Sequence, residues 1–290
     1  MPSGCKVGSN SSISKSRAMP GFFISYTGRM TTSGGKTVSL VLGSGGARGL
    51  AHIGVIQVLE EKGYTISSIA GCSVGALIGG IYAAGKLTEY ESWVRNLSKL
   101  DMVNMMDIAW EGGGLVKGDR IIAKMIKLVG DRQIEDLPIP FTAVATELES
   151  GREVWLSKGP LFDAIRSSCS LPLFFTPARY NERMLVDGGV VNPVPIAPVF
   201  DDQTDLTLAV NLGGKPLRDT PLKPRKGIGT YDVAFMVFDA MQSTIARQKL
   251  AAYPPDLVID IPRDSARTFD LDRSIEMIEI GRNAAEKALP

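Results

Sequence analysis

Short apolar runs alternate with stretches of helical periodicity through most of the chain. Residues 38–42 read VSLVL and lead into a glycine-rich turn, and the run at residues 66–70 leads into a second turn. Such short, β-branched runs bounded by glycine are typical of buried strands. After the first turn, apolar residues recur at near-helical spacing over residues 50–62, and a small-residue apolar stretch follows the second turn at residues 76–84. The pattern is strand, turn and helix, repeated.

This repeat predicts a parallel βαβ arrangement with right-handed crossovers, which places both turns at the carboxyl edge of one sheet. The same reading of periodicity predicts further elements along the chain. Strands are expected at residues 141–146, 153–156, 184–186, 206–212 and 257–261, and helices at residues 89–97, 120–128, 231–250 and 274–288. We therefore predict an α/β fold with a mainly parallel central sheet flanked by helices.

The length of 290 residues fits one domain. Residues 1–36 are rich in Ser and Gly and lack the apolar stretch of a secretory signal. We expect them to be a disordered or dispensable tail before a single domain at residues 37–290. Two alternatives stay open. The segment can be an organelle transit peptide, because no acidic residue precedes Glu60, or translation can start at Met30.

Charge and cysteine content exclude several classes of function. The chain carries 32 Lys and Arg against 31 Asp and Glu, so no global field attracts nucleic acid. No run approaches the roughly 20 apolar residues that span a bilayer. Cys5, Cys72 and Cys169 are few and far apart, which argues against a disulfide framework and against a zinc site. We expect a cytoplasmic protein without a metal.

The second turn, Gly71-Cys72-Ser73-Val74-Gly75, matches the nucleophile elbow. In that motif a serine lies on a strained strand-to-helix turn, and the flanking glycines allow tight backbone packing. The helix that starts after Ser73 directs free N–H groups and a positive dipole end at the nucleophile. Ser73 is therefore the candidate nucleophile, against the simpler interpretation of a tight turn.

The first turn has two functional interpretations. Gly43, Gly45 and Gly49 fit a pyrophosphate-binding loop, but the second strand then should end in an acidic residue, and it ends in Gly71-Cys72-Ser73. The alternative is an oxyanion hole built from backbone N–H groups near Gly45 and Gly46. A serine on one strand end beside an oxyanion loop on its neighbour makes a coherent site.

The histidine count limits the identity of the base. The chain has one histidine, His52, which lies upstream of Ser73 in the first predicted helix, whereas hydrolases with this elbow carry their histidine last. His52 is interpreted as a partly buried helix residue. The base is then a lysine or a carboxylate, and Asp187, followed by Gly188 and Gly189 after a predicted strand, is the better candidate.

Taken together, these motifs resemble those of patatin-like phospholipases, most closely the compact bacterial type. The matching segments are residues 42–49, 71–75, 168–172 with Pro177, and 187–189, with further likeness at residues 114–119 and 253–257. The resemblance runs from residue 38 to the C-terminus. Cys72 departs from the small or hydroxyl residues that are frequent at its position.

The resemblance implies a three-layer α/β/α hydrolase that cleaves lipid carboxylic esters without a cofactor. Ser73 is the implied nucleophile and Asp187 the base, through an acyl-enzyme, with Arg48 either supporting the loop or meeting a phosphate head group. A Ser–Asp dyad needs a desolvated carboxylate, so we expect a partly buried Asp187 within hydrogen-bond reach of Ser73. Two alternatives remain: a nucleotide-binding module that uses residues 43–49, and a catalytically weak scaffold.

Two apolar segments suggest contact with lipid. The Met-rich cluster at residues 102–110 can form a lid or acyl groove, or else a core element or an oligomer contact. Residues 235–250 mix apolar and basic side chains, and they can touch a membrane or cover the sheet. Peripheral membrane contact is therefore an additional expectation, while the sequence does not set the oligomeric state, the head group or the acyl chain length.

Overall fold

The computed structural model describes residues 35–97, 101, 116–217 and 229–290. Within this part of the chain, Gly35–Pro290 form one compact unit. The expectations for residues 1–34 and for the Met-rich cluster at residues 102–110 lie outside the described residues.

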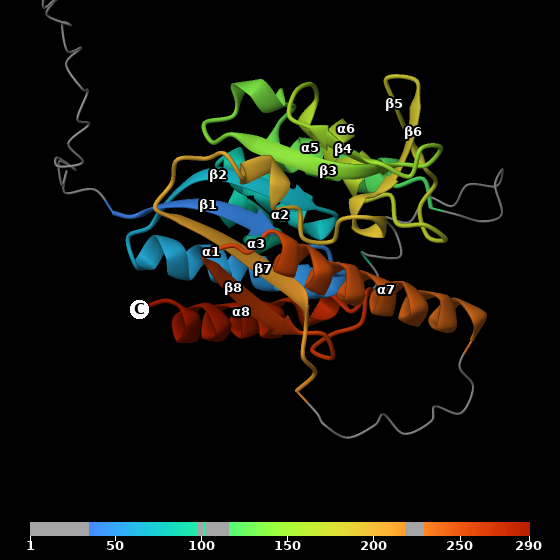
Figure 1. The fold of residues 1–290 in the computed structure, drawn as a ribbon. Helices are drawn as coiled ribbons and strands as arrows, with labels where there is room; N and C mark the ends of the chain where they lie inside the picture. The colour runs from blue at the N-terminus through green and yellow to red at the C-terminus, as the bar shows by residue number, and fades with distance from the viewer. Residues whose placement is uncertain (1–34, 98–100, 102–115, 218–228) are drawn as a thin grey trace, which may run out of the picture. The chain divides into compact units, whose positions relative to one another are not determined.

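A single sheet forms the centre of the described unit (Figure 1). Its strands are β1 (Thr37–Leu42), β2 (Thr65–Cys72), β3 (Phe141–Glu147), β4 (Glu153–Leu156), β5 (Ala178–Tyr180), β6 (Arg183–Asp187), β7 (Leu206–Gly214) and β8 (Leu257–Pro262). Along the path β5-β6-β3-β2-β1-β7-β8 each strand is hydrogen-bonded to the next, and β4 also pairs with β3. Strands β3, β2, β1, β7 and β8 pair in parallel, and β4, β5 and β6 pair antiparallel. The predicted mainly parallel sheet is confirmed.

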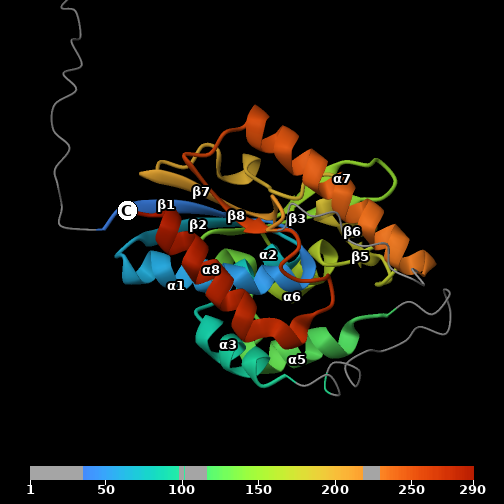
Figure 2. The ribbon, with the colours of Figure 1, turned by 90° about the horizontal axis from the view of Figure 1, so that it is seen from below.

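Helices cover both faces of the sheet (Figure 2). They are α1 (Ala51–Glu61), α2 (Val74–Ala83), α3 (Leu87–Arg95), α5 (Asp119–Val129), α6 (Leu161–Ser168), α7 (Thr230–Ala252) and α8 (Ser274–Ala288). Helices α1 and α8 lie side by side on one face, with α3 and α5 beyond them, whereas α7 lies on the other face. The result is the expected three-layer α/β/α arrangement.

Alternation along the strands explains why both faces are covered. In β1, Val38, Leu40 and Leu42 point into the large core beneath α1, α2 and α8. Val41 points to the opposite face, where it packs in a smaller core with Ala246 of α7. Because both faces of β1 are buried, its sequence is almost continuously apolar, as is usual for a central parallel strand.

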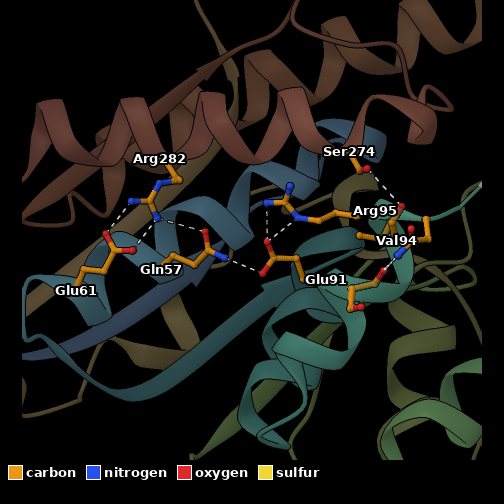
Figure 3. A network of polar contacts seen from close by, with 9 residues as sticks. Gln57, Glu61, Glu91, Val94, Arg95, Ser274 and Arg282 are labelled. Atoms are coloured by element: carbon orange, nitrogen blue, oxygen red, sulfur yellow. Dashed lines mark hydrogen bonds and ion pairs between the residues drawn. The ribbon is translucent and has the colours of Figure 1, made fainter.

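A polar network links α1, α3 and α8 on the outer side of the large core (Figure 3). Arg282 of α8 donates to both carboxylate oxygens of Glu61, at 2.9 and 2.8 Å. Gln57 of α1 donates to Glu91 of α3 at 2.7 Å, and Arg95 donates to the same carboxylate. Such exposed ion pairs add little stability each, but together they fix the relative positions of three helices.

The register of β3 brings the ends of two strands together. Val144 and Ala145 of β3 both pair with β4 on one side. On the other side, Val144 pairs with Cys72, the last residue of β2, and Ala145 pairs with Asp187, the last residue of β6. Since β2 is parallel and β6 antiparallel to β3, the two strands run toward each other along the same side of β3. Their final residues therefore meet.

Two described elements were missed by the periodicity, namely α6 and β5. Helix α6 has eight residues and β5 has three. Both are shorter than the window over which helical or alternating periodicity becomes distinct from chance. The omission of α6 matters, because its last residue, Ser168, contacts the candidate site.

Candidate active site

Ser73 occupies the turn between β2 and α2. Its backbone has φ 56° and ψ −125°, a conformation that is strained for a residue with a side chain. The neighbouring glycine permits the turn to pack closely, because a Cβ on Gly75 would lie 2.1 Å from the carbonyl oxygen of Leu42. Gly71, in β2, packs on the backbone of Gly75 in the same way. The turn between β2 and α2 is therefore strained at Ser73 and tightly packed at Gly71 and Gly75.

Ser73 and Asp187 are in contact. The Ser73 hydroxyl donates to Asp187 Oδ2 at 2.5 Å across 114 positions of sequence. The second carboxylate oxygen accepts the Gly189 N–H at 2.8 Å, and the Cys72 thiol lies 4.0 Å from it. Asp187 is 1% exposed, so it is fully buried where partial burial was expected. One carboxylate oxygen of Asp187 thus accepts from the Ser73 hydroxyl, and the other accepts from the backbone of the turn that follows.

Burial raises the pKa of Asp187 from 3.8 to about 6. Removal from water disfavours the ionised carboxylate, and the hydrogen bonds from Ser73 and Gly189 oppose this effect only in part. A carboxylate with a raised pKa is a stronger proton acceptor than an ordinary aspartate and is still ionised at neutral pH. The electrostatics therefore suit Asp187 to accept the Ser73 proton.

Ser168 positions the elbow and was not identified from the sequence as a site residue. Its buried hydroxyl accepts the Ser73 N–H at 2.9 Å and donates to the Val144 carbonyl at 2.6 Å. Next to it, the Ser170 carbonyl accepts the Asp187 N–H at 2.9 Å. The short segment at the C-terminal end of α6, residues 168–170, therefore holds the backbones of both Ser73 and Asp187. The only signal in the sequence was the resemblance of residues 168–172 to a family block.

The glycine-rich loop after β1 lies beside Ser73 and Asp187. A Cβ on Gly49 would clash with Val74 at 2.2 Å, and one on Gly189 would lie 2.7 Å from the Ser44 hydroxyl. The N–H groups of Ser44 and Ala47 are occupied by the Pro193 and Thr268 carbonyls. Within the described residues, the N–H groups of Gly45 and Gly46 have no such partner, so they remain the loop donors that can bind an oxyanion.

The other predicted glycines shape this edge of the sheet. Gly43 follows β1, and its N–H donates to the Val210 carbonyl at 3.1 Å. Gly188 begins the short turn after Asp187, and a Cβ there would lie 2.1 Å from the Val144 carbonyl oxygen. Because neither residue has a side chain, neighbouring backbone segments pack directly against Gly43 and Gly188, next to Ser73 and Asp187.

Arg48 connects the glycine-rich loop to neighbouring segments. Its buried guanidinium donates to the Gly45 carbonyl at 3.0 Å and to the Arg263 carbonyl at 2.9 Å, and forms an ion pair with Asp239 of α7. Gln242, also on α7, donates to the Ser44 hydroxyl at 3.1 Å. Of the two roles considered for Arg48, these contacts match support of the loop. Asp239 and Gln242 are further contributors that the sequence did not reveal.

His52 lies in α1 and is fully buried. Its Nε2 donates to the Gly43 carbonyl at 2.9 Å, and burial lowers its pKa to about 4, so the ring is neutral at physiological pH. The side chain therefore holds the start of the loop. This matches its interpretation as a helix residue, although it is more deeply buried than expected.

In the described ranges, no group of three or more His, Cys, Asp and Glu side chains is arranged to hold a metal ion. The helices found there are also too short or too polar to cross a bilayer.

The chain is similar to several known proteins. A family model described as patatin-like phospholipase matches residues 40–200. An uncharacterized NTE family protein of Mycobacterium tuberculosis is 34% identical, over 90% of this chain and 93% of that protein. Lysophospholipase NTE1 of Candida glabrata is 26% identical over 85% of this chain and 16% of its own length. Among solved structures, VipD from Legionella pneumophila matches with a TM-score of 0.45 and 13% identity, over 87% of this chain and 66% of that chain.

Proposed function

The chain belongs to the patatin-like phospholipase family, and we propose that it hydrolyses carboxylic esters of lipids through an acyl-enzyme on Ser73. The family match covers residues 40–200 and so includes the loop, the elbow and Asp187. Relatives named lysophospholipase support a substrate of the phospholipase A or lysophospholipase type. The observation that carries the proposal is the hydrogen bond from the Ser73 hydroxyl to the buried Asp187 carboxylate.

In the first half of the reaction, Ser73 attacks the carbonyl carbon of the ester. Asp187 accepts the hydroxyl proton through the existing hydrogen bond, and its raised pKa makes this transfer less unfavourable. The elbow conformation fixes the position of the Ser73 side chain before the substrate arrives. Little orientational freedom is then lost on reaching the transition state.

The tetrahedral intermediate carries a negative charge on the former carbonyl oxygen. The Ser73 N–H is occupied by Ser168, so the donors in this proposal are the N–H groups of Gly45 and Gly46. The N-terminus of α2 directs its dipole toward the same place. Donors fixed in advance contribute strongly to such reactions, and losing one costs about 10²–10³ in rate.

In the second half, the protonated Asp187 gives its proton to the leaving alcohol as the ester bond breaks. Water then attacks the acyl-enzyme, and Asp187 accepts a proton from that water. Asp187 returns this proton to the Ser73 oxygen as the fatty acid leaves. One carboxylate thus serves as base and acid in turn. The neutral His52, bonded to the Gly43 carbonyl, takes no part.

The hydrolase is favoured over the alternatives by the contact between Ser73 and Asp187. Neither a nucleotide-binding loop nor a scaffold requires a buried carboxylate on the hydroxyl of the elbow serine. In this proposal residues 37–290 are the hydrolase domain, and residues 1–36 are dispensable.

A hydrolysis screen tests the proposal. Purified protein is incubated with a panel of phospholipids, lysophospholipids and acylglycerols, and released fatty acid is measured by mass spectrometry. Wild type is expected to release fatty acid, whereas Ser73→Ala and Asp187→Asn are not. Asp201→Asn, at an exposed carboxylate, is the matched control and keeps full activity. A folded wild type that releases no fatty acid, or an active Asp187→Asn, contradicts the proposal.

A further inference from the structure

Helix α7 presents an apolar face to solvent over its N-terminal half. Val233, Met236, Val237 and Met241, here called the α7 strip, are 49% to 56% exposed. Their spacing of three or four residues places them on one side of the helix. Farther along α7 the exposed positions are the polar Thr244, Arg247 and Gln248, followed by the small Ala251 and Ala252. The large apolar side chains exposed on α7 are therefore confined to its N-terminal half.

The opposite side of the same helix supports the candidate active site. Asp239 pairs with Arg48, and Gln242 donates to the Ser44 hydroxyl. Both partners belong to the glycine-rich loop. Only the thickness of α7 thus separates the α7 strip from residues that hold this loop.

Aromatic side chains connect α7 to segments that contact the glycine-rich loop. Phe235 of α7 packs edge-on against Phe269 with ring centroids 5.4 Å apart, and Phe269 packs on Phe174 at 4.3 Å. Thr268, next to Phe269, accepts the Ala47 N–H through its carbonyl. Three segments distant in sequence therefore meet in an aromatic cluster beside the oxyanion loop.

Leu173 adds a further exposed aliphatic side chain to this surface. It precedes Phe174 and is 54% exposed, yet its φ is +68°, a conformation that a bulky L-residue rarely adopts. Its turn is closed by the Phe175 N–H, which donates to the Leu171 carbonyl at 2.9 Å. Strain of this kind persists only where the surrounding structure enforces it. Here it keeps an aliphatic side chain in solvent next to the aromatic cluster.

We infer that the α7 strip, together with Leu173 and Phe269, rests in the surface of a phospholipid bilayer and so brings the Ser73 edge of the sheet to its substrate. This inference rests on the proposed lipid hydrolysis. An apolar strip on one face of a helix, with cations at its border, is the pattern of interfacial helices. Arg247 on α7 and Arg267 beside Phe269 are both exposed and meet that requirement.

The size of the apolar surface favours lipid over a second copy of the chain. The half-exposed side chains of the α7 strip offer on the order of 400 Å², about half of the roughly 800 Å² that each partner of a stable interface buries. A bilayer needs no matching pocket, and a few inserted side chains suffice for reversible contact.

Vesicle flotation tests the inference. The Ser73→Ala protein is used throughout so that hydrolysis does not alter the vesicles, which contain phosphatidylcholine and phosphatidylglycerol. The test variant adds Met236→Gln and Val237→Gln. The matched control adds Phe200→Gln, at a side chain that is 64% exposed and lies close to Asp202, which bonds Ser39 away from the Ser73 edge. Thermal melting shows whether each variant is folded.

The double variant is expected to lose about tenfold in vesicle partitioning, and the control less than about twofold, because two inserted apolar side chains are replaced by amides. Leu173→Gly is expected to lower partitioning while keeping the melting temperature, since glycine adopts a positive φ without strain.

Three results overturn the inference: no binding by the parent protein, equal binding by the double variant, or a concentration-dependent dimer that the double variant abolishes. Failure of the proposed function is distinct, because wild-type protein then binds vesicles without releasing fatty acid.

Discussion

Replacing Asp187 by asparagine is expected to stabilise the fold at neutral and alkaline pH. Burial raises the pKa of this carboxyl from 3.8 to about 6 in the folded protein. The folded state therefore holds the proton more tightly than the unfolded state between these two values. Stability is highest below the lower value and falls as pH rises through the higher one. A difference of about two pKa units corresponds to roughly 3 kcal/mol of unfolding free energy.

Asparagine keeps the shape of Asp187 but cannot ionise. Its Oδ1 still accepts the Gly189 N–H, which holds the turn after β6. The unfolding free energy of Asp187→Asn should exceed that of wild type by about 3 kcal/mol near pH 8 and approach it near pH 3, below both pKa values. For a domain of this size, the difference corresponds to a melting temperature roughly 6 to 12 °C higher.

Urea unfolding followed by circular dichroism at both pH values measures the effect. Asp201→Asn, at an exposed carboxylate, serves as the control and should show no pH-dependent difference. A gain that is equal at both pH values, or an Asp187→Asn protein less stable than wild type near pH 8, would refute the argument that burial raises the pKa of Asp187.

Three further predictions follow from the geometry of the site. The value of kcat/KM for a soluble ester should fall about tenfold per pH unit below a pKa of about 6. If the acidic limb of the pH profile instead gave the ordinary pKa of an aspartate, Asp187 would be excluded as the base. Ser168→Ala leaves the Ser73 N–H and the Val144 carbonyl without the Ser168 hydroxyl, so the free energy of unfolding in urea should fall by about 1–3 kcal/mol. The substitution should also lower kcat more than KM, and an unchanged kcat would show that Ser168 does not position the elbow. Gly75→Ala places a Cβ 2.1 Å from the Leu42 carbonyl oxygen and should destabilise the fold by more than about 3 kcal/mol, whereas Gly229→Ala, whose Cβ meets only Asp232 at 3.5 Å, should melt like wild type.

The sequence was most informative where a local pattern alone sets the structure. Alternation and β-branched residues predicted β1 and β2 to within two residues at each end, because both strands are central and buried on both faces. The elbow motif was recognisable because a strained serine turn needs glycine on either side, and in the structure Gly75 packs closely on the Leu42 backbone.

What could not be predicted depends on contacts between distant segments. The direction of β6 is one example. Asp187 was expected at a strand end, but it meets Ser73 because β6 runs antiparallel to β3 and stops where β2 stops. No local pattern encodes that register. Ser168, Asp239 and Gln242 were missed for a related reason, since each acts on the site only through the tertiary packing of α6 or α7.

Labelling with a fluorophosphonate, followed by intact-mass and peptide mass spectrometry, tests the central claim most directly. The account predicts one adduct per chain on Ser73, none on Ser73→Ala, and much slower labelling of Asp187→Asn, because the hydroxyl then lacks its proton acceptor. Folded wild-type protein that remains unlabelled, or an adduct that maps to another residue, would contradict it.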